Sequence, residues 1–157
     1  MEADVEQIFD VSPVIAQSEV VALVEVTAVS FEPAGIADFP AVRTRYRVIE
    51  PIKGVTRGEL LETSSVGGPY RAPGGEDVFL VLREGRNEAP GDRLVVFFDR
   101  NAAGYLGDNN VLARFQVAAD GTVIPEPRSI RLHVAGRPVT EVVSDYGRIA
   151  VRQGATP

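Results

Sequence analysis

Residues 42–48 read VRTRYRV, and this stretch points to the fold class of the chain. Three arginines, Arg43, Arg45 and Arg47, alternate with valine, threonine and tyrosine. Successive side chains of a strand point to opposite faces, so the pattern predicts a strand with one face in the core and the arginines in water. The preceding run VVALVEVTAV, residues 20–29, is too rich in β-branched residues for an exposed helix and predicts a long, mostly buried strand.

The composition indicates further strands. Valine supplies 24 of the 157 residues, and 15 glycines and 11 prolines provide many turns. Because β-branched side chains pack well on a pleated sheet, we expect several short strands joined by tight connections. The pair Asp120-Gly121 favours a two-residue hairpin turn of type I′. Other strands are expected at residues 58–64, 77–83, 94–98, 111–118 and 122–124, with the strand at 77–83 central and apolar on both faces.

Two helices and two long loops complete the expected elements. Ser12 and Pro13 are typical of a helix start with the serine as N-cap, so a short helix is predicted over residues 13–19. Apolar residues at helical spacing predict an amphipathic helix over about residues 140–152. Prolines and glycines predict loops, which we place at residues 31–40 and 67–75.

The number of strands favours a closed arrangement. A chain of 157 residues has the length of one domain, so we expect a single domain over residues 1–157. Five to seven antiparallel strands must hide their sheet edges, and closure into a small barrel does this. We therefore predict an all-β fold, a small closed OB-like Greek-key barrel over about residues 19–134 with a short N-terminal helix and a C-terminal amphipathic helix. An open sandwich is the alternative.

The order of these segments resembles one known family. A short helix and a valine-rich strand precede YRVIEPIKG at residues 46–54, a glycine-rich loop precedes GEDVFLVL at residues 75–82, and a hairpin region follows at residues 105–115. Over roughly residues 14–124 the chain resembles the bacterial exported domains that are similar to the netrin-like fold of the tissue inhibitors of metalloproteinases. In those domains an extended Tyr-x-Val segment is followed closely by Lys-Gly, and a Gly-Glu pair precedes an apolar strand.

This resemblance implies an OB-like five-stranded barrel and a location outside the cytoplasm. It does not carry over the inhibitory mechanism of the animal proteins. Those proteins chelate the protease zinc with an N-terminal cysteine and are braced by disulfides, whereas this chain has no cysteine. Only the scaffold and the location are implied, because a fold does not fix a function.

The arginine row is the first candidate binding surface. Arg43, Arg45 and Arg47 lie about 7 Å apart along one strand face, and guanidinium groups bind polyanions and acidic partners. The plainer interpretation, which we favour, is a solvated face whose charge is balanced by acidic residues on neighbouring strands.

Tyr70 and Arg71 form the second candidate site, in the middle of the loop predicted over residues 67–75. An aromatic ring and a guanidinium at a loop tip are common anchors in recognition surfaces. The alternative is a loop folded back on the barrel, with Tyr70 covering apolar surface.

Several kinds of site are disfavoured by composition. The lack of cysteine removes disulfides, thiolate metal sites and cysteine nucleophiles, and the single histidine, His133, removes sites that need two. Residues 99–104, DRNAAG, echo the first half of a calcium-binding loop, but the later ligand positions are missing, so a plain hairpin loop is expected. We predict no catalytic residue, no metal site and no cofactor.

Charge and hydropathy bound the partners and the location. A net charge of −6 disfavours broad binding to nucleic acid or to anionic membranes. No apolar stretch reaches 18 residues, so no transmembrane helix is predicted. The start MEAD lacks the basic and apolar regions of a signal peptide. We nevertheless expect an exported protein, periplasmic, surface-bound or secreted, whose signal peptide lies outside this sequence.

The expected function is binding without catalysis. We expect an exported bacterial binding or inhibitor-like module that contacts an unknown protein partner through loops at one end of the barrel. One alternative is an OB-like protein that binds single-stranded nucleic acid. Another is a small hydrolase with an unrecognised carboxylate site.

Overall fold

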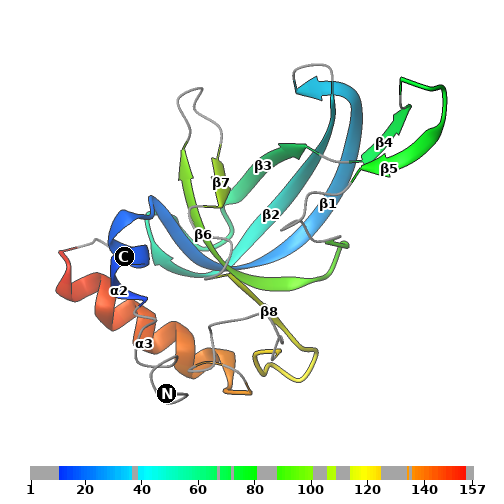
Figure 1. The fold of residues 1–157 in the computed structure, drawn as a ribbon. Helices are drawn as coiled ribbons and strands as arrows, with labels where there is room; N and C mark the ends of the chain where they lie inside the picture. The colour runs from blue at the N-terminus through cyan, green and yellow to red at the C-terminus, as the bar shows by residue number, and fades with distance from the viewer. Residues whose placement is uncertain are drawn as a thin grey trace, which may run out of the picture.

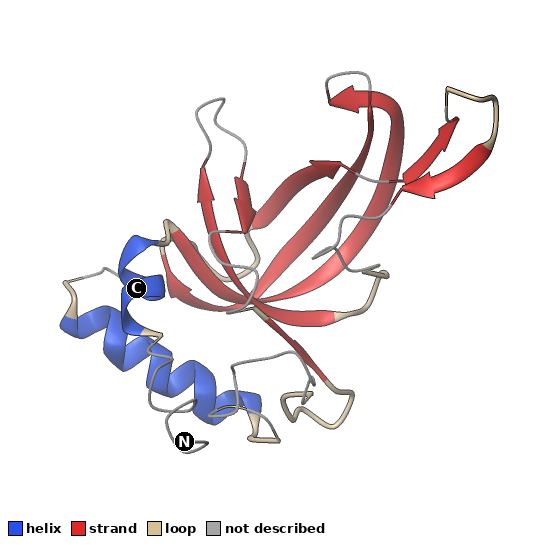
Figure 2. Cartoon of the chain, in the orientation of Figure 1, coloured by secondary structure: helices blue, strands red, loops and turns tan. Residues whose placement is uncertain are grey.

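The structure, a computed structural model, describes most of the chain. Figure 1 shows the order of its elements, and Figure 2 separates helices from strands. The described part of the chain contains eight strands and two helices. The described residues are 11–36, 39–66, 68–71, 73–80, 88–100, 106–108, 114–124, 134 and 136–154.

Five strands close into a barrel (Figure 1). Around the ring the order is β1 (Val20–Ile36), β2 (Phe39–Lys53), β3 (Leu60–Val66), β7 (Leu106–Asp108) and β6 (Arg93–Arg100), and β6 pairs with β1 to complete it. Neighbouring strands are antiparallel except β3 and β7, which are parallel. An extra strand, β8 (Phe115–Val117), pairs with β6. The closed β-barrel predicted from the sequence is confirmed, and the open sandwich is not the fold.

The segment predicted as a loop over residues 31–40 is mostly strand, so that prediction is wrong. β1 continues to Ile36 and β2 begins at Phe39, and the two strands pair as far as these residues. Proline was the reason to expect a loop, because it lacks the N–H that a central strand needs. Within the described residues, however, this end of β1 pairs only with β2, and a strand edge tolerates a residue such as Pro33.

The prediction for residues 67–83 is also corrected. β4 (Gly68–Arg71) pairs with β5 (Asp77–Leu80) in a separate two-stranded sheet, so half of the expected loop is strand. β5 is not central, because among the described residues it pairs only with β4. An apolar run predicts burial but not which neighbour supplies it, and Pro69 is allowed because a two-stranded ribbon consists of edges.

The apolar side chains form two clusters, one on each side of the barrel wall. Alternate residues of β1 and β6 point inward, and the intervening residues point outward toward the helices. The inner cluster includes Val20, Ala22, Val24 and Val26 of β1, Tyr46 and Val48 of β2, and Leu94, Val96 and Phe98 of β6. The outer cluster includes Val21, Leu23, Val95 and Phe97. Two buried faces explain why these strands read as continuous apolar runs.

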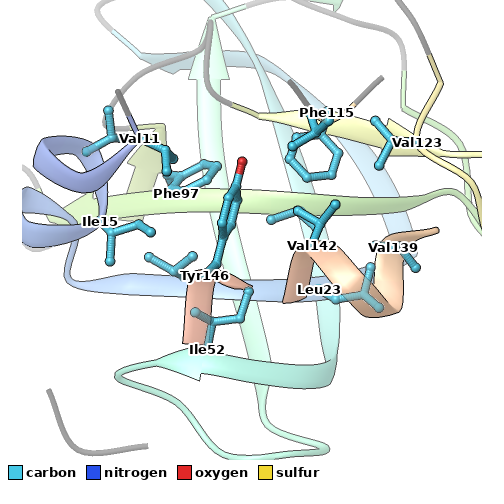
Figure 3. Close-up of a cluster of buried hydrophobic side chains, with 14 of the residues drawn as sticks. Val11, Ile15, Leu23, Ile52, Phe97, Phe115, Val123, Val139, Val142 and Tyr146 are labelled. Atoms are coloured by element: carbon cyan, nitrogen blue, oxygen red, sulfur yellow. The ribbon is translucent and has the colours of Figure 1, made fainter. Parts of the chain in front are cut away.

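The C-terminal helix covers the outer cluster (Figure 3). α3 (Val139–Arg152) agrees with the helix predicted over residues 140–152. Its Tyr146 ring lies 5.9 Å from the ring of Phe97 and 6.3 Å from that of Phe115, centroid to centroid, in tilted and edge-on arrangements. Aromatic pairs at these distances and angles add to the energy of burial. The helix is therefore part of a second hydrophobic core, the outer cluster.

The N-terminal helix forms where expected, with a different cap. α2 (Ser12–Gln17) has Val11 as its N-cap and no side-chain hydrogen bond there, so the prediction that Ser12 is the cap is wrong. The side chain that closes this helix lies at its other end, where the Ser18 hydroxyl donates to the Val14 carbonyl at 2.6 Å. Lys53 of β2 also donates to the Ile15 carbonyl, at 2.8 Å, which ties the helix to the barrel.

The hairpin predicted at Asp120-Gly121 forms with a longer turn. The Ala118 N–H donates to the Thr122 carbonyl, and the Gly121 N–H donates to the Ala118 carbonyl. The turn thus holds three residues instead of two, with Gly121 at a φ of 89°. A glycine at positive φ in the last position is typical of three-residue hairpin loops.

Candidate functional site

The arginine row lies on the outer side of the barrel, and glutamates of the adjacent strands pair with it. The register sets Arg45 of β2 opposite Glu62 of β3, and Arg47 opposite Glu25 of β1. The side chains follow this register, with 2.9 Å between Arg45 Nε and Glu62 Oε2, and 3.2 Å between Arg47 Nη2 and Glu25 Oε2. Opposite charges on facing residues stabilise neighbouring strands.

Arg43 and Arg93 extend these pairs into two short networks. Arg43 lies 2.8 Å from Glu32 and 3.5 Å from Glu62, so Glu62 is shared with Arg45. Arg93 lies 3.7 Å from Glu25, which is shared with Arg47. We call this surface the outer charged face, consisting of Arg43, Arg45, Arg47, Arg93, Glu25, Glu32 and Glu62. Its charges nearly balance, which agrees with the plainer interpretation of the row as a solvated face.

Arg71 lies on a different sheet from the arginine row. It is at the end of β4, opposite Asp77 of β5, and its Nε lies 3.3 Å from Asp77 Oδ1. Both side chains are largely exposed, at 74% and 83%. The turn residues between the strands, 73–76, are exposed as well. Tyr70 belongs to β4, but its side chain lies outside the described residues.

A buried polar cluster that the sequence did not reveal lies inside the barrel. The Tyr46 hydroxyl donates to Glu88 Oε2 at 2.7 Å, and the Arg114 guanidinium is ion-paired with Glu88 Oε1. The side chains of Glu88 and Arg114 are each only 9% exposed. We call Tyr46, Glu88 and Arg114 the barrel cluster. The prediction that Tyr46 points inward is confirmed.

One signal in the sequence marks the barrel cluster. Arg114 stands in VLARFQV, residues 111–117, where a charged residue interrupts a mostly apolar run of the sequence. A charge in such a position needs a buried partner, because an unpaired buried charge costs much free energy. The sequence could therefore have suggested a buried carboxylate, but not that Glu88, 26 residues earlier, supplies it.

The start of α3 carries a third group of charges. Arg137 donates to Asp145 at 2.7 Å, and Arg148 is also paired with Asp145. The hydrogen bond from Arg137 lowers the pKa of Asp145 below its ordinary value, against a smaller opposing effect of burial. The same bond raises the pKa of Arg137. These contacts hold the segment before the helix against its second turn and are structural in character.

Metal-binding groups and membrane-spanning helices are the remaining candidate features. Within the described ranges, no group of three or more histidine, aspartate or glutamate side chains is placed to hold a metal ion. His133 and most of the calcium-like loop, including residues 101–105 and 109–110, lie outside the described residues. None of the described helices is both long enough and apolar enough to span a bilayer.

Comparison with known proteins adds no relative. No protein-family model matches the chain, and searches of curated proteins and of solved structures find no match either. The features that bear on function are therefore the outer charged face, the β4–β5 hairpin and the barrel cluster.

Proposed function

We propose that the chain is a non-enzymatic, exported bacterial binding or inhibitor-like module that contacts a protein partner with the β4–β5 hairpin at one end of the barrel. The observation that carries this proposal is the position of that hairpin. It stands out from the barrel as a separate two-stranded sheet, on the far side from α2 and α3 (Figure 1).

The β4–β5 hairpin lies outside the barrel and needs support from it. A two-stranded sheet has marginal stability by itself, since it has little core of its own. β4 contacts β1 and β2, so the base of the hairpin is anchored while its tip is exposed. A rigid scaffold that presents an exposed tip is the common arrangement of binding surfaces. Arg71 at this tip has the side-chain type that is enriched among energetically important interface residues.

The strand order supports an OB-like barrel, and we infer a netrin-like relationship from it. Five strands in the ring β1-β2-β3-β7-β6 form a small, mostly antiparallel barrel, as in OB-folds. The Lys-Gly pair of the resemblance has a structural role here. Lys53 holds α2, and Gly54 passes close to the backbone at Glu19. Export is part of this proposal, because the resembling domains are exported.

Nucleic-acid binding is the second candidate, because OB-folds bind single strands on the face formed by their second and third strands. The outer charged face extends over β2 and β3. Two observations weigh against this function. The arginines there are paired with glutamates, and the tilted Tyr46–Phe98 ring pair lies in the inner cluster instead of on the barrel surface. A single-stranded oligonucleotide that binds with an affinity falling steeply in salt would favour this candidate.

Capture of partners from the envelope or medium of the source bacterium tests the main proposal. The bait is the full chain, compared with the variants Tyr70→Ala and Arg71→Ala. If the hairpin is the contact, at least one variant should lose about tenfold or more in apparent affinity for a captured protein, as truncated anchor residues do.

Arg57→Ala is the matched control. Arg57 is an exposed arginine with one glutamate partner, Glu50, and lies in the β2–β3 connection instead of the hairpin. This variant should capture the same protein as the unmodified chain. Equal capture by all four baits would remove the hairpin from the proposal.

A further inference from the structure

The barrel cluster has the geometry of a site for a carboxylate group. Each oxygen of the Glu88 carboxylate has its own donor, the Tyr46 hydroxyl for Oε2 and the Arg114 guanidinium for Oε1. Tyr46 is 2% exposed, and its ring packs 5.4 Å from that of Phe98, so the hydroxyl is held in place by the inner cluster. Tyr46 thus comes from β2 of the barrel wall, and Arg114 comes from the residue just before β8.

The carboxylate comes from a different part of the chain. Glu88 lies just before a turn that is tied to β1 by two backbone hydrogen bonds, Gly91 N–H to the Val26 carbonyl and Val26 N–H to the Asp92 carbonyl, both 2.8 Å. The turn is closed locally, since the Ala89 N–H donates to Asp92 Oδ2 at 2.9 Å. Glu88 therefore reaches Tyr46 and Arg114 from just before a turn that lies outside the strands of the barrel wall.

We propose that Tyr46 and Arg114 form a carboxylate-binding site inside the barrel, and that Glu88 occupies it as a ligand built into the chain. The site binds an external carboxylate anion when the side chain of Glu88 is absent. This inference does not depend on the proposed function, because it concerns the barrel interior and not the β4–β5 hairpin.

The burial of the site and its two donors should make it specific for carboxylates over chloride. A guanidinium and a hydroxyl placed on the two oxygens of one group match the shape of a carboxylate, whereas a chloride ion offers a single centre. Charge-assisted hydrogen bonds strengthen when water is excluded, and both charged partners here are nine-tenths buried. In the unmodified chain, Glu88 competes from a high effective concentration, so external carboxylates should bind far more weakly.

Chemical rescue of Glu88→Ala tests the proposal. The variant should melt at a lower temperature than the unmodified chain, because the buried ion pair between Glu88 and Arg114 is lost. Sodium acetate or formate should then raise the melting temperature above that in sodium chloride at equal ionic strength. For a dissociation constant of about 10 mM, about 100 mM acetate would shift the unfolding equilibrium roughly elevenfold.

Three comparisons isolate the site. The unmodified chain should show no difference between acetate and chloride, which controls for general salt effects on stability. Glu62→Ala removes an exposed glutamate that also pairs with arginine, and should show no acetate-specific gain. Glu88→Ala combined with Arg114→Met should lose the gain, because the donor to one oxygen is gone.

The outcomes decide between a binding site and a merely structural ion pair. If Glu88→Ala folds in acetate but not in chloride, the acetate-specific gain in stability is larger than expected, and this outcome also supports the proposal. If Glu88→Ala folds in neither salt, Glu88→Ser replaces it, since a smaller polar side chain leaves space for the anion with less disruption. If the variant that folds shows equal stability in acetate and chloride, or if neither folds in either salt, the proposal is overturned.

Discussion

Gly54 is the residue whose substitution the backbone tolerates least among the glycines of the described part. Its φ is +77°, a conformation in which other residues are strained, and a Cβ built there would lie 2.1 Å from the Glu19 carbonyl oxygen. We expect Gly54→Ala to lower the free energy of unfolding by more than about 2 kcal/mol, because left-handed backbone alone costs roughly 1–2 kcal/mol. Urea denaturation measures this loss.

Gly58→Ala is the matched control for that variant. Gly58 has a similar φ of +83°, but no atom lies within 4 Å of the position of its Cβ. It should lose only the conformational contribution of roughly 1–2 kcal/mol. Equal losses for the two variants would show that the close approach to Glu19 contributes nothing.

Two arginines of this chain illustrate how burial changes the value of an ion pair. Arg114→Ala should destabilise the fold by roughly 3–5 kcal/mol, since it leaves the carboxylate of Glu88 buried without its charge partner. Arg45→Ala should cost at most about 1 kcal/mol, since Arg45 and Glu62 are exposed. Thermal unfolding at low and high salt compares them. A larger loss for Arg45→Ala would contradict this account.

The residue scale is also where prediction of the candidate sites was least complete. Alternation alone placed Arg43, Arg45 and Arg47 outside and Tyr46 inside, because period two fixes the face of a strand. The barrel cluster needed more than a pattern. Glu88 and Arg114 are 26 residues apart, so a local sequence window carries no information about their contact.

At the scale of elements, an ion pair holds the segment before α3 against the helix, and this contact is sensitive to acid. Arg137 lowers the pKa of Asp145 below its ordinary value of 3.8. A carboxyl with a lowered pKa in the folded state stabilises the fold above its unfolded pKa, and the gain is lost as the pH falls through the folded value. The contribution is therefore present near neutral pH and disappears under acidic conditions.

Asp145→Asn tests that contribution. The variant should be less stable than the unmodified chain at neutral pH by no more than about 1 kcal/mol, because the side chains of Asp145 and Arg137 are 34% and 35% exposed. The difference should shrink as the pH falls below about 4. Urea denaturation over a pH series measures it, and a difference that stays constant down to strongly acidic pH would contradict the assignment.

Elements with a strong period were predicted well, and elements with prolines and glycines were not. The strand at 42–48 and the helix at 140–152 bury one face each, so their pattern follows directly from their packing. Residues 31–40 and 67–75 were assigned to loops because proline and glycine usually interrupt strands. In this fold residues 31–36, 39–40 and 68–71 lie in paired strands, where an edge tolerates Pro33 and Pro69, and only the pairing in the structure reveals that.

For the molecule as a whole, the two apolar clusters share the same wall. β1 and β6 contribute side chains to both, so neither cluster can form without the strands that build the other. We therefore expect one cooperative unfolding transition. Far-UV circular dichroism reports the strands. Tyrosine fluorescence reports the two clusters, because Tyr46 lies in the inner cluster and Tyr146 in the outer one. Both signals should change at the same urea concentration.

Equivalent truncations on the two sides provide the check. Val96→Ala in the inner cluster and Val142→Ala in the outer cluster each remove a fully buried pair of methyl groups. Each variant should lose roughly 1–3 kcal/mol and keep a single transition in both signals. Fluorescence and circular dichroism midpoints that separate in either variant would show that the clusters unfold independently.

The shared wall restricts what evolution or an engineer can do with this scaffold. Removing the C-terminal helix to obtain a minimal barrel would uncover part of the outer cluster, whose barrel-wall residues are Val21, Leu23, Val95 and Phe97. Such a fragment would need those four positions rewritten as polar residues to avoid self-association. We therefore expect substitutions to be tolerated best in the β4–β5 hairpin and on the outer charged face, where the charged side chains are exposed.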